Sequence, residues 1–464
     1  MPDDNQGSPE LELIDIYERP DKIYTRSFTG YFRNLRMLGG GFLFLLFFGT
    51  AWVNLGGQQA VLFDLPARKF HIFGATFWPQ DFILLSWLLI IAAFALFAIT
   101  VFAGRVWCGY TCPQSVFTWV FMWAEKVTEG DRNKRMKGDK GSISVDLFMR
   151  KLAKHGIWTA VSLATAITFV GYFTPIRELV PDIFSWDIGS WSLFWIGFFA
   201  LATYGNAGFL REMVCLHMCP YARFQSVMFD NNTLVVAYDH NRGESRGPRK
   251  KSVDPKEKGL GDCIDCSVCV QVCPTGIDIR NGLQYSCITC AACIDACDTI
   301  MDKMGYEKGL IRYTTENELN GTKTHLVRPR MVGYAAALVI MFGMFFYSLE
   351  TRSSFELDIL RDRNQLYRTN ANGDIENVYT LKLVNKDETP HQMTVQVSGI
   401  EGLKANSAMT FTVGSGEVAS HIVRLALPAG ADTKGNKEIE FTISAEDESL
   451  PETTTSSRFI TPIK

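Results

Sequence analysis

The stretch from Cys263 to Cys297 decides the fold of the central part of this chain. It reads Cys263-x2-Cys266-x2-Cys269-x3-Cys273-Pro274, followed by a spacer and Cys287-x2-Cys290-x2-Cys293-x3-Cys297. These two runs contain eight of the twelve cysteines of the 464-residue chain. Closely spaced thiolates are good ligands for soft transition metals, so two runs with the same spacing predict two related metal centres.

This spacing is typical of the two-cluster bacterial ferredoxins. In that arrangement three closely spaced cysteines bind one [4Fe-4S] cluster, and the fourth cysteine of each run binds the other cluster. The predicted ligands of the first cluster are Cys263, Cys266, Cys269 and Cys297, and those of the second are Cys287, Cys290, Cys293 and Cys273. Zinc sites and disulfides fit less well, because zinc usually uses two pairs of ligands separated by a longer spacer. Asp298 replaces the proline expected after the second run, a change we expect to affect the local turn and not the ligands.

The rest of the chain contains five segments that are long and apolar enough to cross a bilayer. They are approximately residues 38–55, 82–103, 157–175, 191–210 and 332–349. Lysine and arginine concentrate before the first segment and between the second and third, which predicts a cytoplasmic N-terminus. Five crossings then place the C-terminal domain in the periplasm. The polar residues 1–36 predict no secretory signal, and the apolar aromatic runs favour a lipid bilayer and no nucleic-acid partner.

The predicted fold is that of a multi-domain membrane protein with a five-helix transmembrane domain. An α+β ferredoxin-like module is inserted into it, and the alternating short strands after Glu350 predict a C-terminal all-β immunoglobulin-like sandwich. The predicted domains are a cytoplasmic N-terminal segment at 1–36, a four-span membrane domain at 37–239, the cytoplasmic ferredoxin-like domain at 240–330, a fifth transmembrane helix at 331–350 and the periplasmic sandwich at 351–464.

The four remaining cysteines form two matching Cys-x3-Cys-Pro motifs. Cys108 and Cys112 follow Arg105, and Cys215 and Cys219 follow Arg211. Each motif comes directly after a predicted membrane segment, so the repetition suggests a duplicated two-span unit whose four sulfurs converge. Proline suits the first turn of a helix, which predicts new helices that begin just after Cys112 and Cys219.

Two kinds of chemistry suit these four thiols. A thiol at a helix N-terminus and close to an arginine has a lowered pKa, which we expect for Cys112 and Cys219. Such thiolates bind soft metals such as Cu(I) or form a reversible dithiol. His217 and Met218 lie inside the second motif and are weaker candidates for copper ligands. The alternative is four buried structural cysteines at a helix-packing interface.

Nearly the whole chain resembles the FixG/CcoG (RdxA) family, the accessory proteins of cbb-type cytochrome c oxidase. The stretch from Leu62 to Gly74, continued from Phe77 to Phe82, is similar to the signature of that family between the first two spans. The two Cys-x3-Cys-Pro motifs, the eight-cysteine run and the sandwich also match. The Cys-x3-Cys-Pro motif alone is less specific, because NapH-like and NosR-like membrane electron-transfer proteins share it.

The resemblance implies a membrane-anchored iron–sulfur electron-transfer protein of the bacterial inner membrane that is required for oxidase assembly. It implies cupric reductase activity on the cytoplasmic side, with copper bound or reduced at Cys108, Cys112, Cys215 and Cys219. The implied partners are a cytoplasmic electron donor, copper ions, and oxidase subunits or copper chaperones. Two further functions stay open: a quinol-linked electron-transfer subunit of the NapH type, and a non-catalytic assembly scaffold or chaperone.

Overall fold

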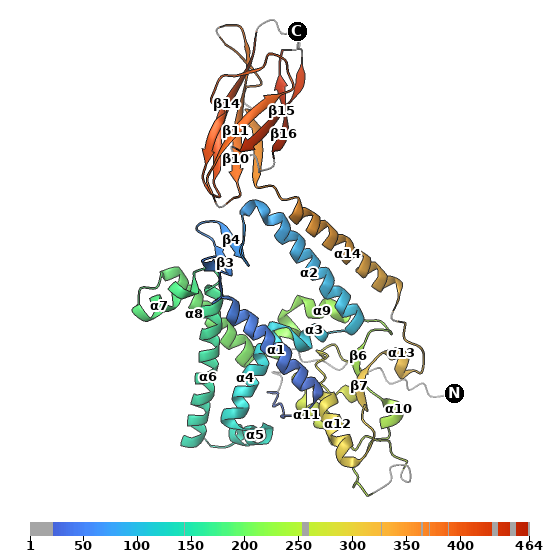
Figure 1. Ribbon diagram of the computed structural model, residues 1–464. Helices are drawn as coiled ribbons and strands as arrows, with labels where there is room; N and C mark the ends of the chain where they lie inside the picture. Colours follow the sequence, from blue (N-terminus) through green and yellow to red (C-terminus); the bar gives the residue numbers. More distant parts are fainter. Residues whose placement is uncertain are drawn as a thin grey trace, which may run out of the picture. The chain divides into compact units, whose positions relative to one another are not determined.

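The computed structural model divides the chain into two compact units (Figure 1). It describes residues 22–142, 144–252, 259–325, 327–362, 365–370, 372–387, 389–428, 435–445 and 452–462. The first unit comprises Met1–Phe44, Phe97–Ala166 and Gly197–Met331, and the second comprises Leu45–Leu96, Ile167–Ile196 and Val332–Lys464. Part of the predicted N-terminal segment, 1–21, and part of the linker before the ferredoxin-like module, 253–258, lie outside the described residues.

The first unit contains the cysteines and is mostly helical. The start of α1 (Tyr31–Thr50) and the end of α2 (Phe82–Ala103) belong to it, together with parts of α6 (Val145–Val170) and α8 (Ser190–Gly205). Shorter helices follow the membrane segments: α3 (Val106–Tyr110), α4 (Pro113–Glu129), α5 (Arg132–Lys140) and α9 (Pro220–Ser226). Two π-helical turns, Asn206–Leu210 and Val214–Met218, lie between α8 and α9.

The ferredoxin-like part of this unit is built around two strands and two helices. Strand β6 (Val235–Tyr238) pairs antiparallel with β7 (Ile311–Thr314), and α11 (Val268–Val272) and α12 (Ala292–Met304) lie between them in sequence (Figure 1). Short helices α10 (His240–Gly243) and α13 (Glu316–Leu319) flank the two strands in sequence. A buried apolar cluster that includes Val236, Ile294 and Met301 joins α12 to the sheet.

The two cysteine runs end differently. Helix α11 stops at Val272, directly before Cys273 and Pro274, because proline cannot continue a helix. Helix α12 instead runs through Cys297 and Asp298 to Met304, so the local turn differs after the second run, as expected from the missing proline. The Asp298 carboxylate accepts a hydrogen bond from the Gly309 backbone N–H at 3.0 Å. The replacement of proline therefore extends the helix by more than one turn.

The second unit is dominated by a β-sandwich. One antiparallel sheet has the order β12-β14-β10-β8, with β9 also paired to β10, and the other has the order β13-β11-β15-β16 (Figure 1). The strands are β8 (Phe355–Arg361), β9 (Arg368–Thr369), β10 (Ile375–Asn385), β11 (His391–Ser398), β12 (Lys404–Ala405), β13 (Thr410–Val413), β14 (Val418–Leu427), β15 (Asn436–Ala445) and β16 (Thr453–Ile460). Alternate residues of these strands, such as Tyr379, Leu381 and Leu383 of β10, form one buried core.

A small sheet in the second unit contains the stretch that carries the family signature. Strands β3 (Val61–Asp64), β4 (Lys69–Ile72) and β5 (Ala75–Phe77) form an antiparallel meander. The buried Asp81 that follows accepts a hydrogen bond from Arg352 at 2.8 Å and lies 3.4 Å from the ammonium of Lys386. Trp78 donates its indole N–H to the Lys386 carbonyl at 2.8 Å. This stretch therefore fixes the base of the sandwich. Short strands β1 (Asn54–Leu55) and β2 (Gln58–Gln59) and helix α7 (Ile176–Ser185) complete the unit.

Three helices among the described residues are long and apolar enough to cross a membrane. They span Pro79–Ala103, Ser190–Leu210 and Pro329–Glu350, and the last contains α14 (Pro329–Glu350). They coincide with the second, fourth and fifth predicted segments. Helices α1 and α6 cover much of the first and third segments, but each begins with a polar, charged turn. The chain is therefore a membrane protein, while the count of five crossings stays a prediction.

Candidate functional site

The eight cysteines of the central stretch line two neighbouring cavities. Cys263, Cys266, Cys269 and Cys297 line one cavity. Cys273, Cys287, Cys290 and Cys293 line the other, and Cys269 reaches both. This grouping has the crossed pattern expected of a two-cluster ferredoxin, in which the last cysteine of each run joins the other set. The residues therefore fit two clusters, and the individual ligand assignments stay predictions.

The backbone of the two runs is also repeated. Asp265 and Ser267 flank the second cysteine of the first run with φ of 52° and 53°. Thr289 and Ala291 occupy the same places in the second run with φ of 53° and 58°. Left-handed conformations are unfavourable for residues with a Cβ and persist where the surroundings impose them, commonly at functional sites. The spacing of the cysteines gave no signal for this repeated loop geometry.

Burial favours the neutral thiol at several cysteines of these cavities. It raises the pKa of Cys269 to about 11 and that of Cys287 to about 12, and it raises the pKa of Cys293 well above its ordinary value. The guanidinium of Arg280 opposes this effect at Cys269. Buried thiols become good ligands when a metal displaces the proton, so metal binding and folding are expected to be coupled here.

The two Cys-x3-Cys-Pro motifs are followed by helices, as predicted. Cys112 is the residue before α4, which begins at Pro113, and Cys219 is the residue before α9, which begins at Pro220. The first cysteines of the two motifs behave differently from thiols at a helix start. Burial raises the pKa of Cys108 to about 12 and that of Cys215 to about 11, and it outweighs the opposing charge of Arg105. The expected lowering of thiol pKa values therefore does not extend to these two cysteines.

The four thiols of the motifs lie close enough for their charges to affect one another. Ionisation of Cys108 is opposed by Cys112, Cys215 and Cys219, in that order. Within the described part of the chain, no three His, Cys, Asp or Glu side chains come together as a ready site for a single metal ion. The four thiols are nevertheless close enough to interact electrostatically. The side chains of His217 and Met218 are exposed.

The first motif packs directly against the second cysteine run. A Cβ atom on Gly109 would lie 2.7 Å from the carbonyl oxygen of Ile288 and 2.9 Å from the Cα of Cys290, so only glycine permits this approach. Cys108 belongs to the same buried cluster as Val272 and Cys290. The contact brings the thiol motif next to the cavity of the second predicted cluster.

Arg105 interacts electrostatically with the motif thiols and with Cys287 of this cavity. It is almost fully buried, and its backbone N–H donates to Thr289 Oγ1 at 3.3 Å while its guanidinium donates to the Ala222 carbonyl. Burial lowers the pKa of Arg105, and Cys108, Cys287, Cys215 and Cys219 favour its charged form. Its positive charge therefore faces both groups of cysteines.

Several residues of the site could not be predicted from the sequence. Gln225 accepts a hydrogen bond from Cys108 Sγ at 3.3 Å and donates to Thr100 Oγ1 at 3.2 Å. Buried Glu125 forms ion pairs with Arg211 and, at 2.5 Å, with Arg135. Asp295 of α12 accepts the backbone N–H groups of Phe32 and Arg33 at the start of α1. These partners are distant in sequence, so no local pattern could indicate them.

The fold and the paired cavities define the class of the protein as an iron–sulfur protein of the membrane. Residues 210–316 match the family model for a 4Fe-4S dicluster domain, and residues 85–127 match that for a 4Fe-4S binding domain. Residues 345–462 match the model for the Ig-like fold at the C-terminal end of FixG.

Similar proteins cover almost the whole chain. Nitrogen fixation protein FixG of Rhizobium meliloti is 36% identical, over 94% of this chain and 92% of that protein. Protein RdxA of Cereibacter sphaeroides is 35% identical, over 94% of this chain and 96% of that protein. A crystal structure of a FixG-related protein from Vibrio parahaemolyticus is 27% identical and covers 24% of this chain and 97% of that one, with a TM-score of 0.22. The chain belongs to the FixG/RdxA family, and it is an iron–sulfur electron-transfer protein.

Proposed function

We propose that this protein passes single electrons from a cytoplasmic donor to Cu(II) and supplies the resulting Cu(I) for assembly of a cbb-type cytochrome c oxidase. The observation that carries the proposal is the contact of Gly109 with Ile288 and Cys290. It brings a group of four soft-metal ligands next to a cavity lined by the cysteines of the second run.

The residues would divide the work as follows. Cys263, Cys266, Cys269 and Cys297 would hold one [4Fe-4S] cluster, and Cys287, Cys290, Cys293 and Cys273 the other. When bound, the clusters supply one-electron carriers between the donor and the copper substrate. Cys108, Cys112, Cys215 and Cys219 would bind copper, because thiolates favour Cu(I) over Cu(II) and so favour its reduction. Each Cu(II) takes up one electron and leaves as Cu(I).

Arg105 would act as a positioning residue in this reaction. Its charge lowers the pKa of Cys108 against the larger opposing effect of burial. Copper has to displace the thiol protons, so a nearby buried cation makes that deprotonation less costly. Gln225 would hold the Cys108 thiol in place through its hydrogen bond at 3.3 Å.

The proposal includes a membrane arrangement. Helices α1 and α6 would cross the bilayer together with the three apolar helices, which gives five crossings. The N-terminus and ferredoxin-like module would then be cytoplasmic and the sandwich periplasmic, in the inner membrane. Its support is the concentration of lysine and arginine before the first segment and between the second and third.

Anaerobic copper reduction tests the proposal. The full-length protein is reduced, Cu(II) is added, and Cu(I) formation is followed with a chelator while the cluster absorbance is recorded. The same assay is run on a variant in which Cys108, Cys112, Cys215 and Cys219 are replaced by serine. We expect rapid reduction by the wild type and a loss of at least about a hundredfold in the variant, with unchanged cluster absorbance.

Two results would contradict the proposal. If the clusters of the wild-type protein stay reduced after addition of Cu(II), copper is not the electron acceptor. Equal rates of copper reduction for the wild type and the serine variant would show that the four thiols are not the site of copper reduction. A matched control replaces Ser142, an exposed residue outside the site, by alanine and is expected to leave the rate unchanged.

A second candidate function comes from the match of residues 85–127 to a 4Fe-4S binding domain, because this stretch contains Cys108 and Cys112. In this case the four motif cysteines hold a third cluster and the protein only relays electrons. Iron analysis separates the two candidates. We expect about eight irons per chain for two clusters, whereas a third cluster would raise the content to about twelve, falling back to about eight in the serine variant.

A quinol-linked subunit and an assembly scaffold would each behave differently in experiments on the same proteins. A quinol-linked subunit would be reduced by a quinol analogue, and its serine variant would lose quinol-linked reduction of the clusters. A scaffold would support oxidase assembly without electron transfer. Removal of residues 351–464 would then abolish assembly and leave copper reduction unchanged.

A further inference from the structure

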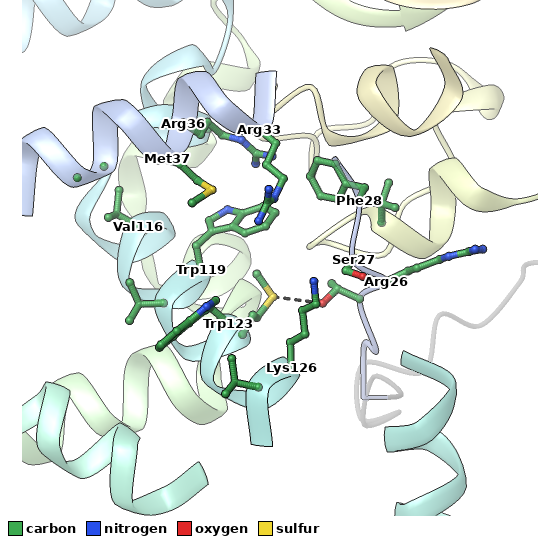
Figure 2. Close-up of a pocket in the computed structure, with 18 of the residues that line it drawn as sticks. Arg26, Ser27, Phe28, Arg33, Arg36, Met37, Val116, Trp119, Trp123 and Lys126 are labelled. Carbon is green, nitrogen blue, oxygen red and sulfur yellow. Dashed lines mark hydrogen bonds between the residues drawn. The ribbon is translucent and has the colours of Figure 1, made fainter. Parts of the chain in front are cut away.

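A cavity of about 520 Å³ opens between the start of α1 and helix α4 in the first unit (Figure 2). Its apolar lining residues include Met37, Phe44 and Val116. Three cations, Arg33, Arg36 and Lys126, also line it, with Arg33 and Arg36 at the α1 end next to Met37 (Figure 2). Neither the cysteine chemistry nor the proposed reaction uses this cavity.

Arg36 is the unusual feature of the cavity. Its side chain is 8% exposed, and its three guanidinium nitrogens have no hydrogen-bond partner among the described residues. The guanidinium carbon lies 4.2 Å from the ring centre of Trp119 and 5.6 Å from that of Phe28, which stabilises the charge in part. A buried guanidinium without an anionic or hydrogen-bonding partner is strongly unfavourable, so this side chain points to a missing ligand.

Asp131 also lines the cavity, but its carboxylate does not act as a partner of the Arg36 guanidinium. Asp131 accepts hydrogen bonds from the backbone N–H of Ser27 at 3.0 Å, from the Ser27 hydroxyl at 3.1 Å and from the backbone of Arg132. Burial opposes its ionisation, but these bonds outweigh burial and lower the pKa of Asp131, so its charge is already compensated by Ser27 and Arg132. Cations therefore outnumber available acids along the described cavity wall, and an anion is the complementary ligand.

The position of Arg36 is imposed by the fold. Asp295 of α12 accepts the backbone N–H of Phe32 at 3.1 Å and that of Arg33 at 2.7 Å, so it caps the start of α1 from the ferredoxin-like module. Gly30 permits this contact, because a Cβ there would lie 2.3 Å from the Asp295 carboxyl carbon. The first turns of α1 are thereby fixed against α12, and Arg36 is held facing α4.

We propose that this cavity binds the head group of an anionic phospholipid. The phosphate would accept hydrogen bonds from Arg36 and Arg33, since guanidinium groups bind phosphate oxygens in a bidentate manner. An acyl chain would follow the apolar lining residues past Gly41, where no described atom lies within 4 Å of the Cβ position and room is left. Basic pockets between membrane helices, with tryptophan near the head group, are typical of such sites. A neutral quinone would leave the charge of Arg36 uncompensated.

The ligand would touch both parts of the electron-transfer unit. Val272, next to Cys273, and Gly109, next to Cys108, also line the cavity. Loss of the lipid would therefore loosen the contact between the first thiol motif and the second cysteine run. The inference holds whether or not copper is the electron acceptor.

Native mass spectrometry of the full-length protein tests this inference. The protein is washed in mild detergent and then offered phosphatidylglycerol or phosphatidylcholine in mixed micelles. We expect one phosphatidylglycerol to be retained, with at least about tenfold preference over phosphatidylcholine. Arg36→Gln is expected to weaken retention about tenfold or more, and Gly41→Leu to weaken it by filling the apolar part of the cavity. Arg150→Gln, a surface change outside the cavity, is the matched control.

The cluster absorbance distinguishes a loss of lipid binding from a disruption of the first unit, because it is retained only when that unit is intact. If Arg36→Gln disrupts that unit, Arg36→Lys keeps a charge and is expected to retain the lipid more weakly than the wild type. Equal retention of both lipids, or unchanged retention in Arg36→Gln, would overturn the proposal. So would a retained phosphate compound that is water-soluble and absorbs ultraviolet light, because that result would identify a nucleotide in place of a lipid.

Discussion

The two Cys-x3-Cys-Pro motifs have the same spacing and the same preceding arginine, yet the fold uses them differently. Gly109 in the first motif permits contact with Ile288 and Cys290, whereas Leu216 occupies the same place in the second. Arg105 faces cysteine thiols, whereas Arg211 forms an ion pair with Glu125. The two copies of the motif therefore have different roles in the fold. The first motif contacts the cysteine cavity, and the second is anchored by buried charges.

The largest expected effect comes from removing the buried anchor of the second motif. Glu125→Gln leaves Arg135 and Arg211 buried without a carboxylate, which should destabilise the folded state by about 3–5 kcal/mol. The midpoint of unfolding in detergent measures this change. Asp146→Asn removes the carboxylate of an exposed pair with Arg150 and should cost no more than about 1 kcal/mol. Equal effects of the two changes would show that the buried pairs do not anchor the motif.

A smaller effect is expected when the close contact of the first motif is disturbed. Gly109→Ala places a Cβ against the backbone of Ile288 and Cys290, and overpacking of this kind costs about 1–3 kcal/mol. Copper reduction should slow along with the loss of stability. Gly156→Ala, in α6 with no described atom within 4 Å of the new Cβ, should be neutral or stabilise by about 0.5–1 kcal/mol. If the Gly109→Ala protein has the stability and the copper-reduction rate of the wild type, this contact is not needed for the proposed function.

The two arginines provide a third test at the level of thiol reactivity. Arg105 lowers the pKa of Cys108, so Arg105→Gln should decrease the thiolate fraction and slow alkylation of Cys108, by about tenfold for each pKa unit of change. Mass spectrometry after timed alkylation of metal-free protein at pH 8 measures the rate. Arg211→Lys keeps the charge beside Glu125 and should leave this rate unchanged. Slower alkylation in both variants would indicate a general loss of access and no specific effect of Arg105.

A last test is the dependence of stability on pH. The folded-state pKa values of Cys108 and Cys215, about 12 and about 11, lie above the ordinary value of 9.0. A raised pKa favours folding below the ordinary value, and this contribution is lost as pH rises toward the folded-state value. Metal-free protein should therefore lose stability between about pH 9 and 11, and a Cys108→Ser, Cys215→Ser variant should lose less over the same range. Thermal unfolding of both proteins checks the difference, and parallel curves would contradict it.

Local sequence was enough to predict several features of the site. The cysteine spacing predicted two crossed ligand sets, and the cysteines line two cavities in a similar grouping, with Cys269 at both, while the ligand assignments stay predictions. The prolines after Cys112 and Cys219 predicted the starts of α4 and α9, because proline fixes φ at a value suited to the first turn. Alternating apolar residues predicted the sandwich, whose strands bury every second side chain.

Other features of the site could be predicted from the sequence only in part or not at all. Asp298 was expected to change the local turn, and α12 continues through it, because aspartate does not interrupt a helix as proline does. The pKa of Cys108 rises in spite of the adjacent Arg105, because burial disfavours the thiolate more than the charge of Arg105 favours it.

The sequence by itself determined the types of metal-ligating residue, their spacing and the starts of the helices that follow them, because these are local properties. Only the tertiary structure decided how that chemistry is arranged. It brought Gly109 against Cys290, Glu125 to Arg211, and Asp295 to the start of α1, and it left Arg36 buried without a hydrogen-bond partner in the described part of the chain. Each of these depends on residues far apart in the chain, and burial and electrostatic energies are set by such neighbours and not by the residue alone.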